Sequence, residues 1–164
     1  MTIIVKNKHT LQIDEFKFRC CIGKNGSTRR KNEGDIKTPK GTFEIENLYF
    51  RKDSKKKNST KLRCIEIKKN LGCCDDIRFP KKYNKPVKIE KKIKHEKLRR
   101  KDNKYDFLIP IKYNFKAPII NLGSCIFIHL TKNYNPTAGC IALREKDFLI
   151  MLKLIKKNSK IKIF

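Results

Sequence analysis

The 164-residue sequence lacks a long apolar run. No segment approaches the roughly 18 apolar residues that a membrane-spanning helix needs, so we expect no membrane span. Before Lys6 the N-terminal segment holds only a three-residue apolar run, which is too short for the apolar region of a secretory signal. The sequence therefore predicts a chain without an export signal. No internal repeat is visible either.

Metal-site and phosphate-loop motifs are also missing. None of the seven cysteines forms a Cys-x-x-Cys pair, which argues against a zinc site, and we expect no bound metal. An odd number of cysteines would leave one thiol over in a full disulfide framework. Most of them are interpreted as small buried hydrophobic residues in a reducing setting. No Gly-Lys-Ser/Thr stands at the spacing of a phosphate-binding loop.

Acidic residues are scarce, with 16 Asp and Glu against 42 Lys and Arg, and the formal net charge is +26. Clustered basic residues neutralise phosphates, so we expect non-specific binding to polyanions. Lysine, isoleucine and asparagine together fill 68 of 164 positions, and their codons are AT-rich, so genome composition explains much of this charge. Net charge describes non-specific association rather than fold. It does not by itself indicate a dedicated nucleic-acid function.

Short segments of alternating apolar residues are present throughout, which is typical of strands. One helix is predicted after Cys140, because Phe148, Leu149, Leu152 and Ile155 fall at helical spacing. The predicted fold is mainly β with one helix in the C-terminal region, in a single domain of residues 1–164. Strands are expected at residues 2–5, 16–22, 42–50, 64–67, 105–113, 125–130 and 160–164. Loops are expected at residues 51–61, 71–86 and 131–140, and the basic block 90–104 is expected to be a solvated helix or an extended loop.

One histidine and one cysteine stand out between residues 126 and 143. His129 ends an apolar run, and Cys140 follows a glycine eleven positions later. A nearby imidazole can convert a thiol to the nucleophilic thiolate, and a helix beginning close by would favour the thiolate further. Gly139 lets the backbone approach a substrate closely, and the amides of Gly139 and Cys140 are candidates for an oxyanion hole. The residues alone indicate a cysteine acyl-transfer enzyme.

Four segments occur in the order of a known family. They are Gly34-Asp35-x-x-Thr38-Pro39-x-Gly41-Thr42-Phe43, Cys74-Asp75-Asp76 with Tyr83-Asn84, Gly123-Ser124-x-Ile126-Phe127-Ile128-His129, and Pro136-Thr137-Ala138-Gly139-Cys140. Together they resemble the L,D-transpeptidase catalytic domain of the YkuD type, in a short branch with a Pro-Thr-Ala-Gly-Cys motif. The likeness covers nearly the whole chain.

This resemblance implies a mixed-sheet β-sandwich that performs acyl transfer on peptidoglycan stem peptides. Cys140 would form a thioester with a tetrapeptide donor and release D-alanine, and His129 would act as the base. An amine acceptor would resolve the thioester; with water instead, the chain would be an L,D-carboxypeptidase or another amide hydrolase. A basic polyanion-binding protein with an inactive site is the third alternative. No cofactor is required, and we expect a monomer.

The resemblance also implies substrate-binding residues, with departures from the family pattern. The larger family has a second histidine where this chain has Ala138, and an arginine or asparagine where it has Ala142. Arg144 is a candidate to replace the missing basic residue and bind a substrate carboxylate; the alternative is a surface position. Thr137 either hydrogen-bonds in the site or caps the loop.

Asp76 and Tyr83 lie in a segment of turn-forming residues, where the resemblance implies substrate binding. From the residues alone, the paired acids Asp75 and Asp76 have two possible roles. They either perform acid/base work or cap a turn and pair with lysines. The family acts in the cell envelope or periplasm. Because no export signal is found, a cytoplasmic location is the alternative.

Overall fold

The structure is a computed structural model that describes residues 1–55 and 59–164. Strands account for 36 % of the residues and helical segments for 8 %, and the one α-helix lies near the C-terminus, so the prediction of a mainly β fold with a late helix is confirmed. Residues 56–58, which belong to the predicted loop 51–61, lie outside the described residues.

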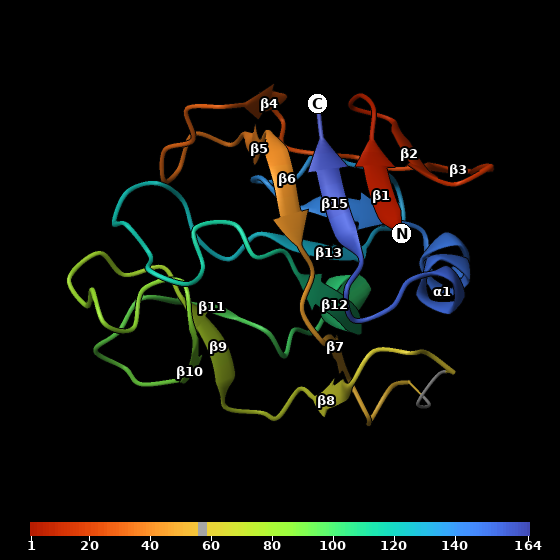
Figure 1. The fold of residues 1–164 in the computed structure, drawn as a ribbon. Helices are drawn as coiled ribbons and strands as arrows, with labels where there is room; N and C mark the ends of the chain where they lie inside the picture. The colour runs from red at the N-terminus through yellow and green to blue at the C-terminus, as the bar shows by residue number, and fades with distance from the viewer. Residues whose placement is uncertain (56–58) are drawn as a thin grey trace.

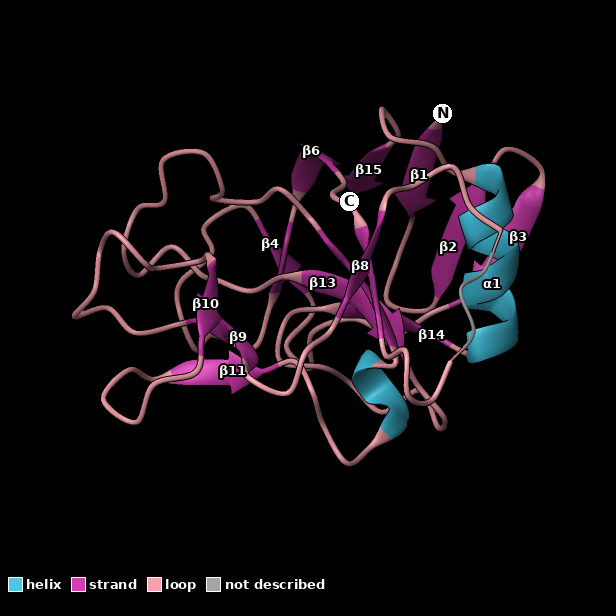
Figure 2. Ribbon diagram, turned by 90° about the horizontal axis from the view of Figure 1, so that it is seen from below, coloured by secondary structure: helices cyan, strands magenta, loops and turns pink. Residues whose placement is uncertain are grey.

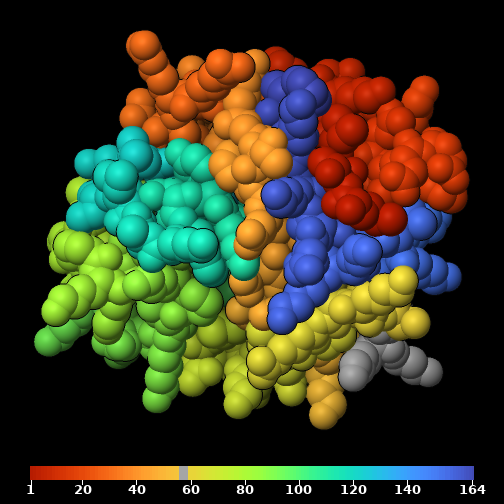
Figure 3. Space-filling model, in the orientation of Figure 1, coloured from red at the N-terminus to blue at the C-terminus, as the bar shows by residue number. Residues whose placement is uncertain are grey.

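The first five-stranded sheet brings the two ends of the chain together. The C-terminal strand β15 (Lys160–Ile163) lies between β1 (Thr2–Val5) and β6 (Gly41–Glu44) (Figures 1 and 3). It runs parallel to β1 and antiparallel to β6. Ile161 and Ile163 alternate with exposed lysines and are buried, as the alternation predicts. The order is β3 (Phe16–Arg19), β2 (Thr10–Ile13), β1 (Thr2–Val5), β15 (Lys160–Ile163) and β6 (Gly41–Glu44).

The second five-stranded sheet crosses behind the first, and the main hydrophobic core fills the space between them (Figure 1). Its order is β14 (Ile141–Leu143), β13 (Phe127–Leu130), β12 (Phe107–Pro110), β7 (Leu48–Phe50) and β8 (Cys64–Glu66). The two predicted faces of β13 are confirmed. Ile128 and Leu130 join the main core, whereas Phe127 joins a second apolar cluster on the opposite face.

Helix α1 (Glu145–Leu154) closes one side of this core. Phe148, Met151 and Leu152 are fully buried, and the ring of Phe148 stacks on that of Phe107 with 6.0 Å between centroids. The helix lies on the opposite side of the molecule from a separate three-stranded sheet (Figure 2).

That three-stranded sheet is built from residues predicted to be loop. It consists of β10 (Pro86–Lys88), β9 (Leu71–Cys74) and β11 (His95–Lys97), in that order. The prediction of a loop over residues 71–86 is therefore wrong at β9. The sequence Leu-Gly-Cys-Cys has no strand pattern of its own, and it is a strand because β10 and β11 pair with it on both sides. The basic block 90–104 forms no α-helix. It is mostly extended and contributes β11 and the short 3-10 helix η1 (Asn103–Tyr105). A two-stranded sheet pairs β4 (Ser27–Thr28) with β5 (Thr38–Pro39).

The predicted strand 42–50 is split between the two large sheets. Its first part is β6 and its last part is β7, and the linking residues bond to other segments: Ile45 N–H donates to Ser159 O and Glu46 N–H donates to Pro110 O. Alternation continues across the junction, because Ile45 is buried in the core that both sheets share. The pattern therefore gave no sign of the change of sheet.

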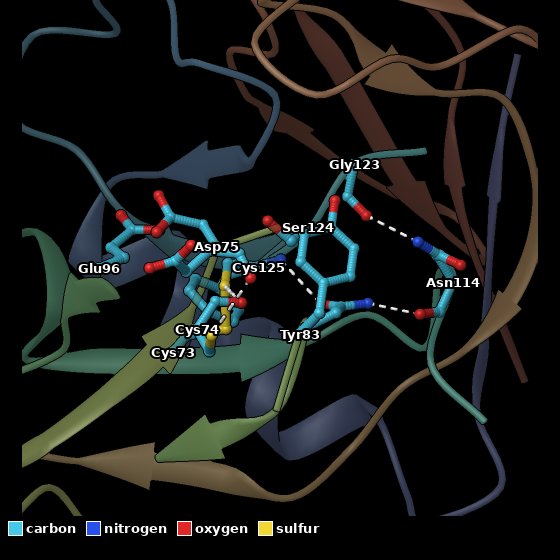
Figure 4. Close-up of a disulfide and its surroundings, with 12 residues drawn as sticks. Cys73, Cys74, Asp75, Tyr83, Glu96, Asn114, Gly123, Ser124 and Cys125 are labelled. Carbon is cyan, nitrogen blue, oxygen red and sulfur yellow. Dashed lines mark hydrogen bonds between the residues drawn. A yellow bond between two sulfur atoms is a disulfide. The ribbon is translucent and has the colours of Figure 1, made fainter. Parts of the chain in front are cut away.

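A disulfide joins Cys73 of β9 to Cys125 just before β13, 52 residues apart (Figure 4). For these two cysteines the interpretation as free thiols in a reducing setting is wrong. Tyr83 lies in a turn, Asn84 and Cys125 have positive φ values, and Asn84 Oδ1 accepts the Cys125 N–H at 2.8 Å, which joins the two segments. The other five cysteines are free, and four of them are buried.

Within residues 1–55 and 59–164, no helix has the length and hydropathy needed to cross a membrane. In the same ranges, no three His, Cys, Asp or Glu side chains are grouped so that they could hold a metal ion.

Candidate active site

His129 and Cys140 line the same cavity, whose volume is about 920 Å³. His129 belongs to β13 and pairs with Ala142 in β14, while Cys140 directly precedes β14. Because β13 and β14 are parallel neighbours, the loop 131–140 leaves the end of β13 and ends beside the same strand, where β14 begins. The sheet therefore brings together two residues that the sequence separates by ten others.

The His129 ring is held in one orientation. Its Nδ1 lies 2.8 Å from the carbonyl oxygen of Leu130, and a carbonyl can only accept, so Nδ1 carries the proton and Nε2 is the acceptor. The Tyr105 ring packs edge-on against it, with 5.1 Å between centroids. Burial, with a smaller contribution from the cations of Lys104 and Arg100, lowers the pKa of His129 to about 4. At neutral pH the side chain is a neutral imidazole that can take a proton.

The Cys140 sulfur is held by backbone groups. Its thiol donates to the carbonyl of Cys125 at 3.5 Å, and it accepts the N–H of Phe127 at 3.3 Å. The residue is only 8 % exposed, and burial raises the pKa of the thiol, as does the nearby Glu96 carboxylate. In the part of the chain that the structure describes, no hydrogen bond joins this sulfur to His129. The resting pair is therefore a neutral thiol and a neutral imidazole.

Gly139 is required by the backbone next to the nucleophile candidate. Its φ is +147°, and a Cβ there would lie 2.9 Å from the carbonyl oxygen of Lys37. The Gly139 N–H donates to Thr137 Oγ1 at 3.1 Å, and Thr137 Oγ1 donates to the Cys140 carbonyl at 2.6 Å. Thr137 thus closes the loop, as one of its two expected roles requires. Thr137 and Gly139 both line the cavity. The oxyanion-hole role of the amides stays a prediction.

The predicted helix is present, but it does not begin directly after Cys140. Strand β14 follows Cys140 directly, and α1 begins only at Glu145. The expectation that a helix N-terminus favours the thiolate is therefore wrong, because the effect of the helix dipole is confined to the first turn.

Arg144, Asp76 and Tyr83 do not line this cavity. Arg144 is exposed, and its Cζ lies 5.2 Å from the centroid of the Tyr134 ring. Asp76 is buried and accepts hydrogen bonds from the guanidinium and N–H of Arg78, which hold its pKa below the usual range. This is the turn-capping role that the residues alone suggested. The substrate-binding roles of these residues stay predictions.

Tyr83 is fully buried and lies beside Ser124 (Figure 4). Its hydroxyl donates to the carboxylate of Glu33, which also accepts from Ser124 Oγ at 2.7 Å. Glu33 does line the cavity, so Tyr83 supports a residue of the site. Lys31, also in the wall, is 4 % exposed and lies 2.5 Å from Asp35.

Sequence reasoning missed many polar residues of the cavity wall, among them Lys31, Glu33, Glu96 and Tyr105. Lys31 and Glu33 directly precede the Gly34-Asp35 motif, and this proximity to a family motif could have indicated that they belong to the site. Glu96 lies within the basic block, where nothing distinguishes it from a solvated acid.

A family model for the L,D-transpeptidase catalytic domain, YkuD, matches residues 1–163. The chain belongs to this family. Comparisons with curated proteins and with solved structures gave no match. The match confirms the resemblance, and it extends over nearly all of the chain. An L,D-transpeptidase catalytic domain is an enzyme domain that acts on peptidoglycan peptides. The assignment of the chain to a short branch of the family that carries the Pro-Thr-Ala-Gly-Cys motif stays a prediction.

Proposed function

We propose that the chain is a cysteine acyltransferase that forms a thioester with a peptidoglycan stem tetrapeptide and passes it to an amine. The observation that supports this most directly is that Cys140 and His129 line one cavity of about 920 Å³, with His129 Nε2 left as the acceptor. Cavities that hold small ligands measure about 300–1,000 Å³, so this one is large enough for part of a stem peptide.

The proposed reaction has two steps that share the same groups. The Cys140 sulfur attacks the carbonyl carbon of the amide that precedes the terminal D-alanine, and a sulfur–carbon bond forms. The thiol proton moves to His129 Nε2 and then to the departing nitrogen as the carbon–nitrogen bond breaks. An acceptor amine next attacks the thioester, loses its proton to His129, and the sulfur regains a proton as it leaves.

The neutral resting pair determines when the proton moves. Burial disfavours both the thiolate and the imidazolium, so a preformed ion pair is costly in the empty cavity. Proton transfer therefore accompanies attack on the bound substrate, with His129 acting as a general base. We further propose the cell envelope as the place of action, since the substrate is found there. Binding to polyanions and a monomeric state stay predictions.

Incubation with purified muropeptide tetrapeptides tests the proposal. We expect the wild type to release D-alanine, to carry the acyl group on Cys140 in intact and peptide mass spectra, and to yield cross-linked dimers. Cys140→Ala should lower turnover by on the order of 10⁴-fold. Cys64→Ala is the matched control, because Cys64 is also a free cysteine but lies outside the cavity. Its turnover should equal that of the wild type.

The products also separate the alternatives. Release of D-alanine with neither dimer nor amine-exchanged product would identify the chain as a hydrolase with the same site. If wild type and Cys140→Ala behave identically, the proposed function is wrong. Steeply salt-dependent binding to polyanions together with no turnover would instead favour the binding-protein alternative.

A further inference from the structure

Glu33 places a carboxylate in the wall of the cavity that contains Cys140 and His129. The residue is half-buried. The hydroxyls of Tyr83 and Ser124, both buried residues, donate to its Oε2. In the part of the chain that the structure describes, Glu33 Oε1 has no hydrogen-bond partner, and it is not among the buried polar atoms that lack one. One oxygen is therefore fixed by the protein, and the other is open to a ligand.

The charge of Glu33 is not matched by a basic side chain. The chain has 42 Lys and Arg, yet among the described residues none forms an ion pair with Glu33. Lys31, two positions earlier, is 4 % exposed, and its Nζ lies 2.5 Å from Asp35 Oδ1. Arg100, also in the cavity wall, donates to both oxygens of Asp102. These two cations are thus bound to other acids, which leaves the Glu33 carboxylate for a cation from outside.

Ser124 connects this carboxylate to the reacting centre. Ser124 directly precedes Cys125, whose carbonyl accepts the Cys140 thiol at 3.5 Å. Adjacent Cα atoms are only about 3.8 Å apart, so neighbouring residues of one segment hold the carboxylate and the sulfur. A ligand group bound by Glu33 therefore lies within the length of a long side chain from a carbonyl that Cys140 attacks.

Three of the sequence motifs meet at this carboxylate. Glu33 directly precedes the Gly34-Asp35 motif, Tyr83 lies in the second segment, and Ser124 lies in the third. The backbone of Glu33 is fixed as well, because its N–H donates to the carbonyl of Asn121 at 2.7 Å. Tyr83 and Ser124 are therefore positioning residues, whose hydroxyls hold one oxygen of Glu33 and so direct the other.

We propose that Glu33 is a specificity-determining residue that binds the side-chain ammonium group of the donor peptide. The third residue of a stem tetrapeptide is a diamino acid, and its carbonyl is the one that Cys140 attacks in the proposed function, on which this inference rests. An ammonium group is only a donor and an ionised carboxylate only an acceptor, so the two are complementary. Hydrogen bonds between such charged groups are stronger than those between neutral groups. Glu33 therefore selects donors that carry an amine at this position.

Two synthetic donors test the assignment. One is a stem tetrapeptide with a diamino acid at its third position, and the other is the same peptide with the side-chain amine replaced by hydrogen. The KM and kcat of D-alanine release are measured for the wild type, Glu33→Gln and Glu44→Gln. The amide oxygen of Glu33→Gln still accepts from Tyr83 and Ser124, so this variant removes only the charge. Glu44→Gln is the matched control, because Glu44 pairs with Lys112 outside the cavity.

In the wild type, the amine-free donor should have a KM about tenfold higher than the diamino donor, at similar kcat. Glu33→Gln should raise the KM of the diamino donor by the same factor and leave that of the amine-free donor unchanged. Glu44→Gln should match the wild type. A merely structural role of Glu33 changes both donors equally. That result, or equal KM values for the two donors in the wild type, overturns the inference.

The same two peptides separate this inference from the proposed function. Absence of turnover refutes the proposed function, and calorimetric binding of both peptides then decides the inference. Tighter binding of the diamino peptide to the wild type, lost in Glu33→Gln, supports it, whereas equal binding or no binding overturns it. If circular dichroism shows that Glu33→Gln does not fold, Glu33→Asp replaces it, because its carboxylate is withdrawn by one methylene. Retention of the full donor preference in that variant overturns the inference.

Discussion

Reduction of the Cys73–Cys125 disulfide is expected to remove much of the free energy of unfolding. The bond joins β9 to Cys125, two residues before β13 begins, across a sequence separation of 52. Loop closure in the unfolded chain gives about 4 kcal/mol at 25 °C for a loop of this size. Small domains are stable by about 5–15 kcal/mol in total, so this one bond supplies a large share.

The same bond lies next to the candidate active site. The Cys125 carbonyl accepts the Cys140 thiol proton, and its N–H is held by Asn84. These hydrogen bonds do not require the disulfide, so we expect the site to survive reduction under conditions in which the chain stays folded. The loss should then appear in stability rather than in the rate of Cys140 labelling at low temperature.

Urea unfolding followed by circular dichroism, with and without dithiothreitol, measures the effect. The midpoint of the wild type should fall on reduction to that of Cys73→Ser/Cys125→Ser, and the double variant should not respond to the reductant. Mass mapping must show that the bond is present before reduction and absent after it. If the wild type then unfolds at the same urea concentration with the same slope, the loop-closure reasoning is refuted.

Two further perturbations address the cavity itself. Between about pH 6.5 and 4, His129 is expected to cost stability, because its pKa of about 4 in the folded chain lies below the unfolded value, so the unfolded state binds the proton first. The stability that neutral His129 contributes is fully present above pH 6.5, and about 3 kcal/mol of it is lost by pH 4. Urea unfolding at several pH values should therefore show a smaller loss of stability in His129→Gln than in the wild type. Equal losses in the two proteins would contradict this account. Gly139→Ala should destabilise by about 1–3 kcal/mol, since its Cβ would meet Lys37 O. Thermal unfolding should show a larger drop than in Gly34→Ala, where φ is also positive but no atom lies within 4 Å, and an equal drop would mean that the contact does not matter.

The sequence by itself determined the features that depend on local pattern. Alternation marked β1, β13 and β15 and assigned the two faces of β13 correctly, because the period of a strand forces neighbouring side chains to opposite sides. Helical spacing marked α1 for the same kind of reason. The order of the motifs was enough to indicate the family, and it singled out His129 and Cys140.

Only the tertiary structure decided the features that depend on residues far apart in the chain. The split of 42–50 between two sheets, the pairing of β9 and the Cys73–Cys125 bond all arise from partners that local pattern does not encode. The electrostatics of the cavity belong to the same class. Burial keeps the Cys140 thiol and the His129 imidazole neutral, because desolvation is a property of the packed molecule and not of any one segment. The fold also places Glu96 and Tyr105, which come from other elements, in the wall of the same cavity.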